Sequence, residues 1–168
     1  MEDESLSTER YRNRLDNAAT YAEVWEIVKD TVKFALHKYR TGMLLFLDDL
    51  PIQLGAYHPL GTNNIVLNRV LIQIVEVTGK PRKVINALIY NLLVHEYLHA
   101  LGETSEVTVR EMVVRIAEKC FGKDYVAAQV ALKSPWALLE GIPLETVNVS
   151  GRVMEIVKDF EKTDRYIV

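Results

Sequence analysis

The spacing of apolar residues along the chain predicts a mostly helical protein. Between Ala19 and Tyr39 apolar side chains recur every three or four residues, the pattern of an amphipathic helix. The same pattern predicts a helix over 106–120, and further helices are expected over 125–132 and 152–160. The most hydrophobic segment, 84–101, is apolar nearly all round, so a helix there would be buried at the centre of the fold.

Two short segments have the character of strands. Met43–Leu47 is an apolar run that lies between Gly42 and a turn of sequence Asp-Asp-Leu-Pro, which favours a buried strand. Asn63–Asn68 predicts a second strand, followed by a helix from near Asn68 to Val77. We therefore expect an α+β fold with a small sheet. No repeat and no linker divides the sequence, so residues 1–168 are expected to form one domain.

Composition narrows the class of protein. Lys and Arg number 20 against 23 Asp and Glu, and a net charge of −3 argues against a nucleic-acid partner bound by broad phosphate neutralisation. A membrane span needs ~20 uninterrupted apolar residues, and no such run occurs, so no membrane association is expected. The acidic N-terminus lacks the pattern of a secretory signal, which predicts a cytoplasmic location. The single cysteine, Cys120, excludes an internal disulfide.

The central segment contains a pattern with specific chemistry, His95-Glu96-Tyr97-Leu98-His99. Residues i and i+4 lie one turn apart on one helix face, so the two imidazoles converge on a point where Zn²⁺ can bind both. Glu96 is placed to act as the general base toward a metal-activated water molecule without being a ligand. The alternative is a structural polar network, but ionisable groups in so apolar a segment are costly to bury without a partner.

A third ligand requires the chain to turn. In an unbroken helix Glu103 would lie ~6 Å further along the axis than His99, so one ion could not bind this set of side chains. A turn at Gly102 would form a helical hairpin in which positions 106–108 face the histidines. Glu106 is therefore the favoured ligand, with Glu103 in the turn and Glu111 deeper in the next helix as alternatives.

The segment His95–Gly102 resembles the active-site helix of the zincin metallopeptidases. With a glutamate as third ligand it is similar to the gluzincin branch, particularly the very small prokaryotic minigluzincins, whereas Ser105 stands where the metzincin pattern has its third histidine. The resemblance implies zinc-dependent hydrolysis of a peptide or protein substrate. It also implies a strand at the rim of the cleft that pairs with substrate, for which the candidate residues are Ile65, Val66 and Leu67; an ordinary sheet strand is the alternative.

Other interpretations stay open at this stage. The protein could be a non-catalytic zincin-like metal-binding module that acts through protein–protein contacts, although the sequence offers no compelling fourth ligand to close the site. Segment 159–168 could fold over the cleft and make the protein latent. Tyr57 and His58 could assist in an active site or could be ordinary loop residues. Nothing in the sequence specifies an oligomeric state.

Overall fold

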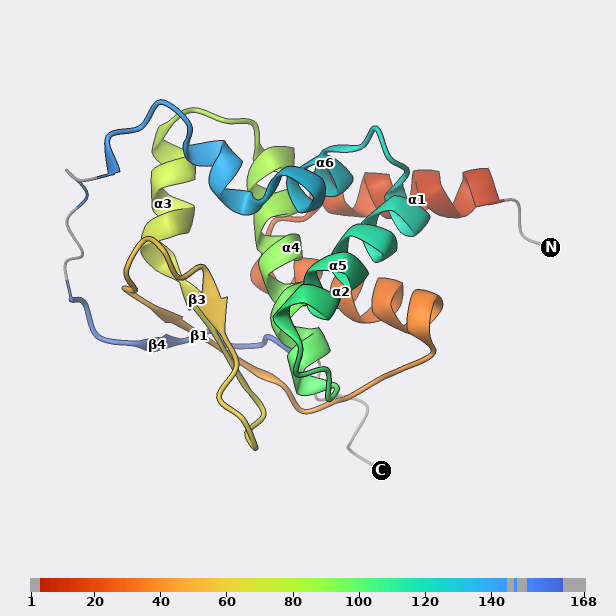
Figure 1. Ribbon diagram of the computed structural model, residues 1–168, viewed down its shortest axis with the longest axis horizontal. Helices are drawn as coiled ribbons and strands as arrows, with labels where there is room; N and C mark the ends of the chain where they lie inside the picture. Colours follow the sequence, from red (N-terminus) through yellow and green to blue (C-terminus); the bar gives the residue numbers. More distant parts are fainter. Residues whose placement is uncertain (1–3, 145–146, 148–150, 162–168) are drawn as a thin grey trace.

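The computed structural model describes residues 4–144, 147 and 151–161, and it has an α+β fold. Most of the helices lie to one side of a small sheet (Figure 1). The described residues form α1 (Glu4–Asn17), α2 (Tyr21–Leu36), α3 (Arg69–Val77), α4 (Arg82–Ala100), α5 (Glu106–Phe121), α6 (Val126–Lys133) and the 3₁₀ helix η1 (Pro135–Leu139). Within this part of the chain, no helix has both the length and the apolar content needed to cross a membrane.

The helices predicted from the apolar pattern are confirmed from α2 to α6, with small shifts at their ends. Helix α2 ends at Leu36, three residues early, because His37 adopts a left-handed backbone conformation with φ of 55° and caps the helix. Helix α1 was not anticipated by the apolar pattern, because only Tyr11 and Leu15 are buried along its length.

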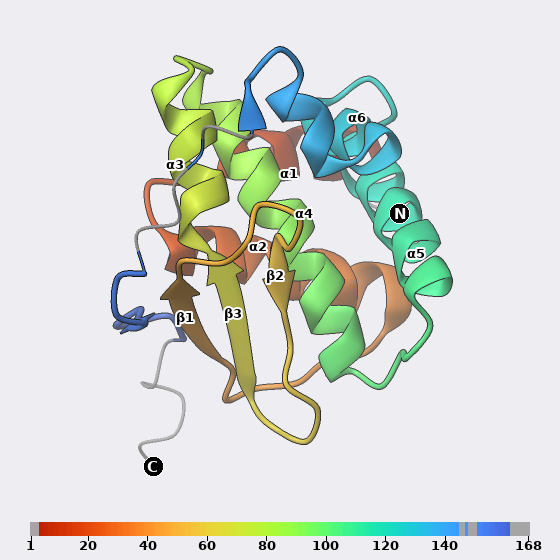
Figure 2. The same cartoon turned by 60° about the vertical axis from the view of Figure 1, so that its left-hand side comes forward.

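The four strands are β1 (Leu44–Asp48), β2 (Ala56–Tyr57), β3 (Asn64–Asn68) and β4 (Glu155–Ile156), arranged in the order β2-β3-β1-β4. Strands β1 and β3 are parallel, with Leu45 opposite Ile65 and Leu47 opposite Leu67. These four side chains are buried, and Figure 2 shows the sheet lying in front of helices α2 and α4. Both predicted strands, over 43–47 and 63–68, are confirmed as β1 and β3.

Strand β3, which contains Ile65, Val66 and Leu67, is an interior strand, as the alternative of an ordinary sheet strand expects. Strand β3 is flanked by β1 on one side and by β2 on the other, and the antiparallel pairing with β2 places Tyr57 opposite Val66. Both edges of β3 are therefore engaged within the sheet. The outer strand at this end is β2, which lies between β3 and α4 in Figure 2.

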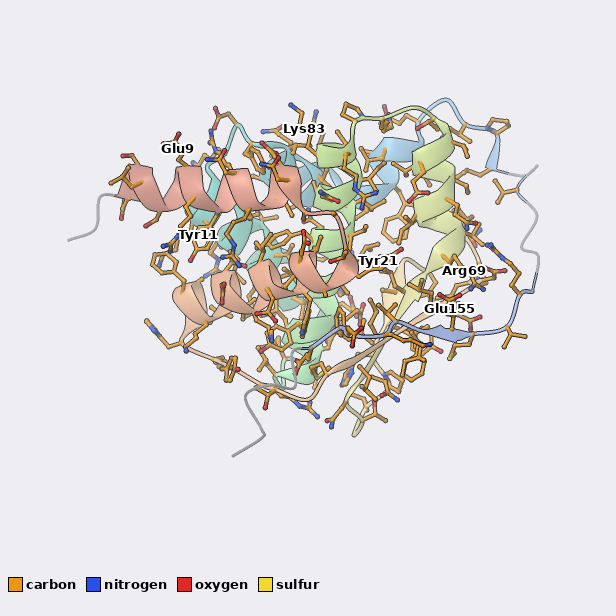
Figure 3. All side chains as sticks on the ribbon, turned by 180° about the vertical axis from the view of Figure 1, so that it is seen from behind. Glu9, Tyr11, Tyr21, Arg69, Lys83 and Glu155 are labelled. Carbon is orange, nitrogen blue, oxygen red and sulfur yellow. The ribbon has the colours of Figure 1, made fainter. Side chains whose placement is uncertain are left out.

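The prediction of a final helix over 152–160 is wrong. The described segment 151–161, here called the C-terminal strap, instead adds strand β4 to the free edge of β1. The carboxylate of Asp49 is completely buried and holds the strap through Arg152, and it also binds Arg69. Arg69 in turn forms an ion pair with Glu155 of the strap, and these two side chains lie near each other in Figure 3. Long-range pairing and these ion pairs therefore override the helical pattern of the segment.

The end of the strap overlaps segment 159–168, which was considered from the sequence as a segment that could fold over the cleft. Phe160 is buried and stacks on Trp25 of α2, with 4.8 Å between the ring centroids. Residues 162–168 lie outside the described residues.

Helix α4 is the centre of the fold. It packs against four other helices, α1, α2, α5 and α6, and against strands β2 and β3 of the sheet. Its N-terminal half is fixed by buried polar contacts: the amide of Asn86 donates to two backbone carbonyls at the end of α1, and Tyr90 shares a hydrogen bond with Thr31 of α2. These contacts fix the N-terminal half of α4, which continues directly into the half that carries the histidines.

Candidate metal centre

His95 and His99 lie one turn apart on the face of α4 that borders α5. Their ring centroids are 5.0 Å apart, and their side chains are 22% and 13% exposed. Residues 91–94 and 96–98 of α4 are buried, whereas His95 and His99 are partly accessible to solvent. The i, i+4 spacing thus places two imidazoles side by side, as the sequence predicted.

The chain then reverses direction through local turn chemistry. Helix α4 ends at Ala100, and Gly102 follows with φ of 109°, a conformation that residues with a side chain rarely adopt. The hydroxyl of Ser105 then accepts a hydrogen bond from the Thr108 amide and begins α5. This short turn brings Glu106, the first residue of α5, back over the two histidines.

Both carboxylate oxygens of Glu106 face an imidazole. Oε2 is 3.0 Å from Nε2 of His95, and Oε1 is 2.8 Å from Nε2 of His99. One ligand atom from each of the three residues can be chosen so that all lie within 4.8 Å of one another. Two ligand atoms bonded to one tetrahedral zinc ion at ~2.0–2.1 Å lie ~3.4 Å apart. The three side chains are therefore close enough to bind one ion after a rearrangement on the order of an ångström.

The tautomer of His99 is the strongest chemical indication of a metal site. Its Nδ1 lies 2.7 Å from the carbonyl oxygen of Glu103, and a carbonyl can only accept, so Nδ1 carries a proton. In the neutral ring, Nε2 then holds a lone pair that points at an oxygen of Glu106. Two acceptor atoms this close need a proton or a cation between them. A hydrogen bond from the other ring nitrogen to a carbonyl is how metal-binding histidines are oriented.

The pKa values of His95 and Glu106 are shifted by burial and by the charges of the neighbouring groups. Burial lowers the pKa of His95 below its usual value, and the nearby Glu106 carboxylate opposes this shift only in part. Burial tends to raise the pKa of Glu106, but the two imidazoles outweigh burial and the pKa of this carboxyl is lowered. At neutral pH the group therefore offers a neutral imidazole at His95 and an ionised carboxylate at Glu106, the forms that bind a metal.

Glu96 lies beside this group but is not part of it. Its side chain is buried, with a residue exposure of 7%. Burial raises the pKa of Glu96 to about 7, while the nearby His99 and the backbone of His58 act in the opposite direction. A carboxyl group in this range can accept and release a proton at neutral pH.

A pocket of about 710 Å³ opens beside His95 and Glu96. The residues Gln53–Ala56, which lead into β2, line one wall, and Arg110 and Glu111 of α5 line another. The remaining surface is mostly apolar and comes from α4, α5, α6 and η1: Leu92, Val113, Val114, Ala131, Leu132 and Trp136. Asn91 also lines the pocket, and its buried Oδ1 has no hydrogen-bond partner among the described residues.

The alternative ligands occupy other positions. The side chain of Glu103 accepts a hydrogen bond from the Ser105 amide, so this residue shapes the turn and orients His99 through its carbonyl. Glu111 lines the pocket but is not in the metal-binding group. His58 contacts Glu96 through its backbone, while its ring faces the carbonyl of Asn64.

Three features of the site were not predicted from the sequence: the pocket, the position of β2 at its rim, and the approach of the His58 backbone to Glu96. Each depends on segments that meet only in the folded chain. Comparison of the chain with family models, curated proteins and solved structures finds no match.

Proposed function

We propose that this protein is a zinc-dependent peptidase, similar in its active site to the zincins, with His95, His99 and Glu106 as the metal ligands. The observation that carries the proposal is the His99 imidazole, whose Nε2 lies 2.8 Å from a carboxylate oxygen of Glu106 while its Nδ1 faces a carbonyl. With the proton of the neutral ring on Nδ1, Nε2 and the carboxylate are two acceptors that a metal ion can join.

Zinc is the favoured ion because the ligands are two imidazoles and one carboxylate. Catalytic zinc sites typically have three protein ligands and leave a position for water or substrate, whereas structural sites use four. Among the described residues, the metal-binding group contains three side chains, and the Glu106 side chain is 60% exposed beside the pocket. When bound, zinc would supply Lewis acidity, which makes a water molecule more acidic and polarises a peptide carbonyl.

Glu96 is the proposed general base. Its carboxylate accepts a proton as the water oxygen bonds to the carbonyl carbon of the substrate, and it delivers that proton to the nitrogen as the C–N bond breaks. The burial of Glu96 keeps bulk water away from the carboxylate, which also lines the pocket.

The substrate is proposed to lie between β2 and the α4–α5 hairpin. Gly55 and Ala56 line the pocket, and β2 is the outer strand of the sheet at this end. An extended peptide could pair with this strand and place one side chain in the apolar pocket. In this arrangement β2 takes the part first expected of Ile65–Leu67.

The test separates metal binding from hydrolysis. Glu96→Gln keeps the shape of the side chain but removes the base, so zinc content should stay near one per chain while cleavage of an unstructured protein falls about 10²–10⁴-fold. Glu118→Gln is the matched control, because it makes the same change in a carboxylate of α5 that lies outside the pocket and the metal-binding group, and it should retain the wild-type activity.

Two results would contradict the proposal. Loss of zinc from Glu96→Gln would make Glu96 a ligand and the mechanism wrong. If the zinc-loaded wild-type protein cleaves nothing in a broad peptide library, the protein is instead a non-catalytic metal-binding module that binds a partner.

A further inference from the structure

The segment 37–43, which connects α2 to β1, passes the end of α4 that carries the histidines. Within it, Arg40 is partly buried and its guanidinium contacts two separate elements. Nη1 donates to the carbonyl of Ala100 at 2.8 Å, and Nη2 donates to the carbonyl of Thr62 at 3.1 Å and to the side-chain oxygen of Asn63. Arg40 therefore joins the end of α4 to the turn between β2 and β3.

Both of these elements carry groups of the proposed active site. Ala100 is the last residue of α4 and directly follows His99. The last carbonyls of a helix have no partner within the helix, and a positive charge is favourable there. Thr62 belongs to the hairpin turn that begins near His58, whose backbone lowers the pKa of Glu96. One guanidinium thus connects the helix end next to a metal ligand with the loop that adjoins the general base.

The backbone of Arg40 is itself fixed to the motif. Its N–H donates to the hydroxyl of Tyr97 at 2.8 Å, and that hydroxyl donates to the Arg40 carbonyl at 3.1 Å. Tyr97 is fully buried and packs edge-on against Trp25, with 4.9 Å between the centroids. The indole N–H of Trp25 donates to Glu161 of the C-terminal strap, which also accepts from the Gly42 amide. The segment is therefore held on both sides of Arg40.

We propose that Arg40 is a positioning residue for the metal centre: it holds His99 and Glu96 in their relative positions without touching either. This inference rests on the proposed function. Arginine is required because its fork of five N–H donors can serve several acceptors in fixed directions, whereas a lysine ammonium acts as a point charge on a flexible stem. Lysine at this position would retain the charge but lose the link between the two elements.

The chain offers a matched control at another helix end. Arg12 donates through Nε to the carbonyl of Phe121, the last residue of α5, and through Nη2 to Asp124 beyond it. Arg12→Ala also removes an arginine that joins a helix end to a following loop, but Arg12 contacts none of the proposed active-site residues. Arg40→Ala and Arg40→Lys are compared with it.

Two measurements on the full chain test the proposal. In metal-free protein, hydrogen exchange is measured at the amides of Gly102 and Glu103, which bond to carbonyls of the last turn of α4. Both amides should exchange several-fold faster in the two Arg40 variants and at the wild-type rate in Arg12→Ala. Zn²⁺ and Co²⁺ affinities are then measured by chelator competition, and the Arg40 variants should bind about 10-fold more weakly. The visible spectrum of bound Co²⁺ should shift only in the Arg40 variants, and millimolar guanidinium should restore part of the affinity of Arg40→Ala.

Wild-type exchange rates, metal affinity and cobalt spectrum in both Arg40 variants would overturn the proposal, as would equal changes in Arg12→Ala. If Arg40→Ala fails to fold, Arg40→Lys decides by the same measurements. If wild-type protein binds neither metal, the proposed function is wrong, and exchange in the metal-free protein still decides whether Arg40 holds the helix end.

Discussion

Replacement of Glu106 by glutamine should weaken metal binding without destabilising the metal-free protein. Each oxygen of the carboxylate faces one imidazole nitrogen, at 3.0 Å for His95 and 2.8 Å for His99. The glutamine amide has one oxygen and one NH₂ group, so one of the two imidazoles no longer faces a carboxylate oxygen. In the metal-free protein the NH₂ group can donate to that imidazole nitrogen, so Glu106→Gln should keep or slightly raise the stability of the apo protein.

The size of the effect follows from the ligand count. Loss of partners that merely orient a ligand costs about 10–100-fold in metal affinity, so loss of one of three ligands should cost at least ~100-fold, or about 2.7 kcal/mol. At a free zinc concentration 100 times the wild-type Kd, zinc stabilises the wild-type fold by about 2.7 kcal/mol. At the same free zinc, the variant would gain only RT ln 2, or about 0.4 kcal/mol.

Urea unfolding with and without chelator-buffered zinc measures both quantities. Glu111→Gln makes the same change of charge on the same helix, outside the metal-binding group, and should retain the wild-type gain in stability. A zinc-dependent gain near 2.7 kcal/mol in Glu106→Gln, or loss of the gain in Glu111→Gln, would refute the assignment of the ligand.

Two further predictions concern the frame around the site. A Cβ added at Gly55 would lie 2.7 Å from Cδ2 of Leu92, so Gly55→Ala should lower the free energy of unfolding by about 1–3 kcal/mol in urea titration; unchanged stability would contradict the close packing at the pocket wall. Asp49→Asn should lower the free energy of unfolding by about 3 kcal/mol, because it removes a buried carboxylate that binds two arginines, and a loss below ~1 kcal/mol would show that the strap is held by other contacts.

The sequence predicted the features that depend on local chemistry. The apolar pattern located α4 and α5, and a turn at Gly102 favoured Glu106 over Glu103 and Glu111 as the residue that faces the two histidines. Helix periodicity and a tight turn act over a few residues, so their combination can be worked out from the order of residues alone.

The errors come from pairing between distant segments. Strand β2 has two residues, Ala56 and Tyr57, which is too short for a pattern, yet its pairing with β3 decides which strand is at the edge. The C-terminal strap has helical periodicity, but β1 and Asp49 hold it in an extended conformation. The role of Arg40 had no local signal either, because its three acceptors are 22, 23 and 60 residues away in the sequence.

The most direct test of the account is a crystal structure of the protein with zinc, with anomalous data collected on both sides of the zinc absorption edge. The account predicts one zinc peak per chain, bonded to Nε2 of His95, Nε2 of His99 and the carboxylate of Glu106, with Glu96 near the ion but not bonded to it. A peak bonded to Glu96, Glu103 or Glu111 in place of Glu106, or no peak between α4 and α5 in protein saturated with zinc, would contradict it.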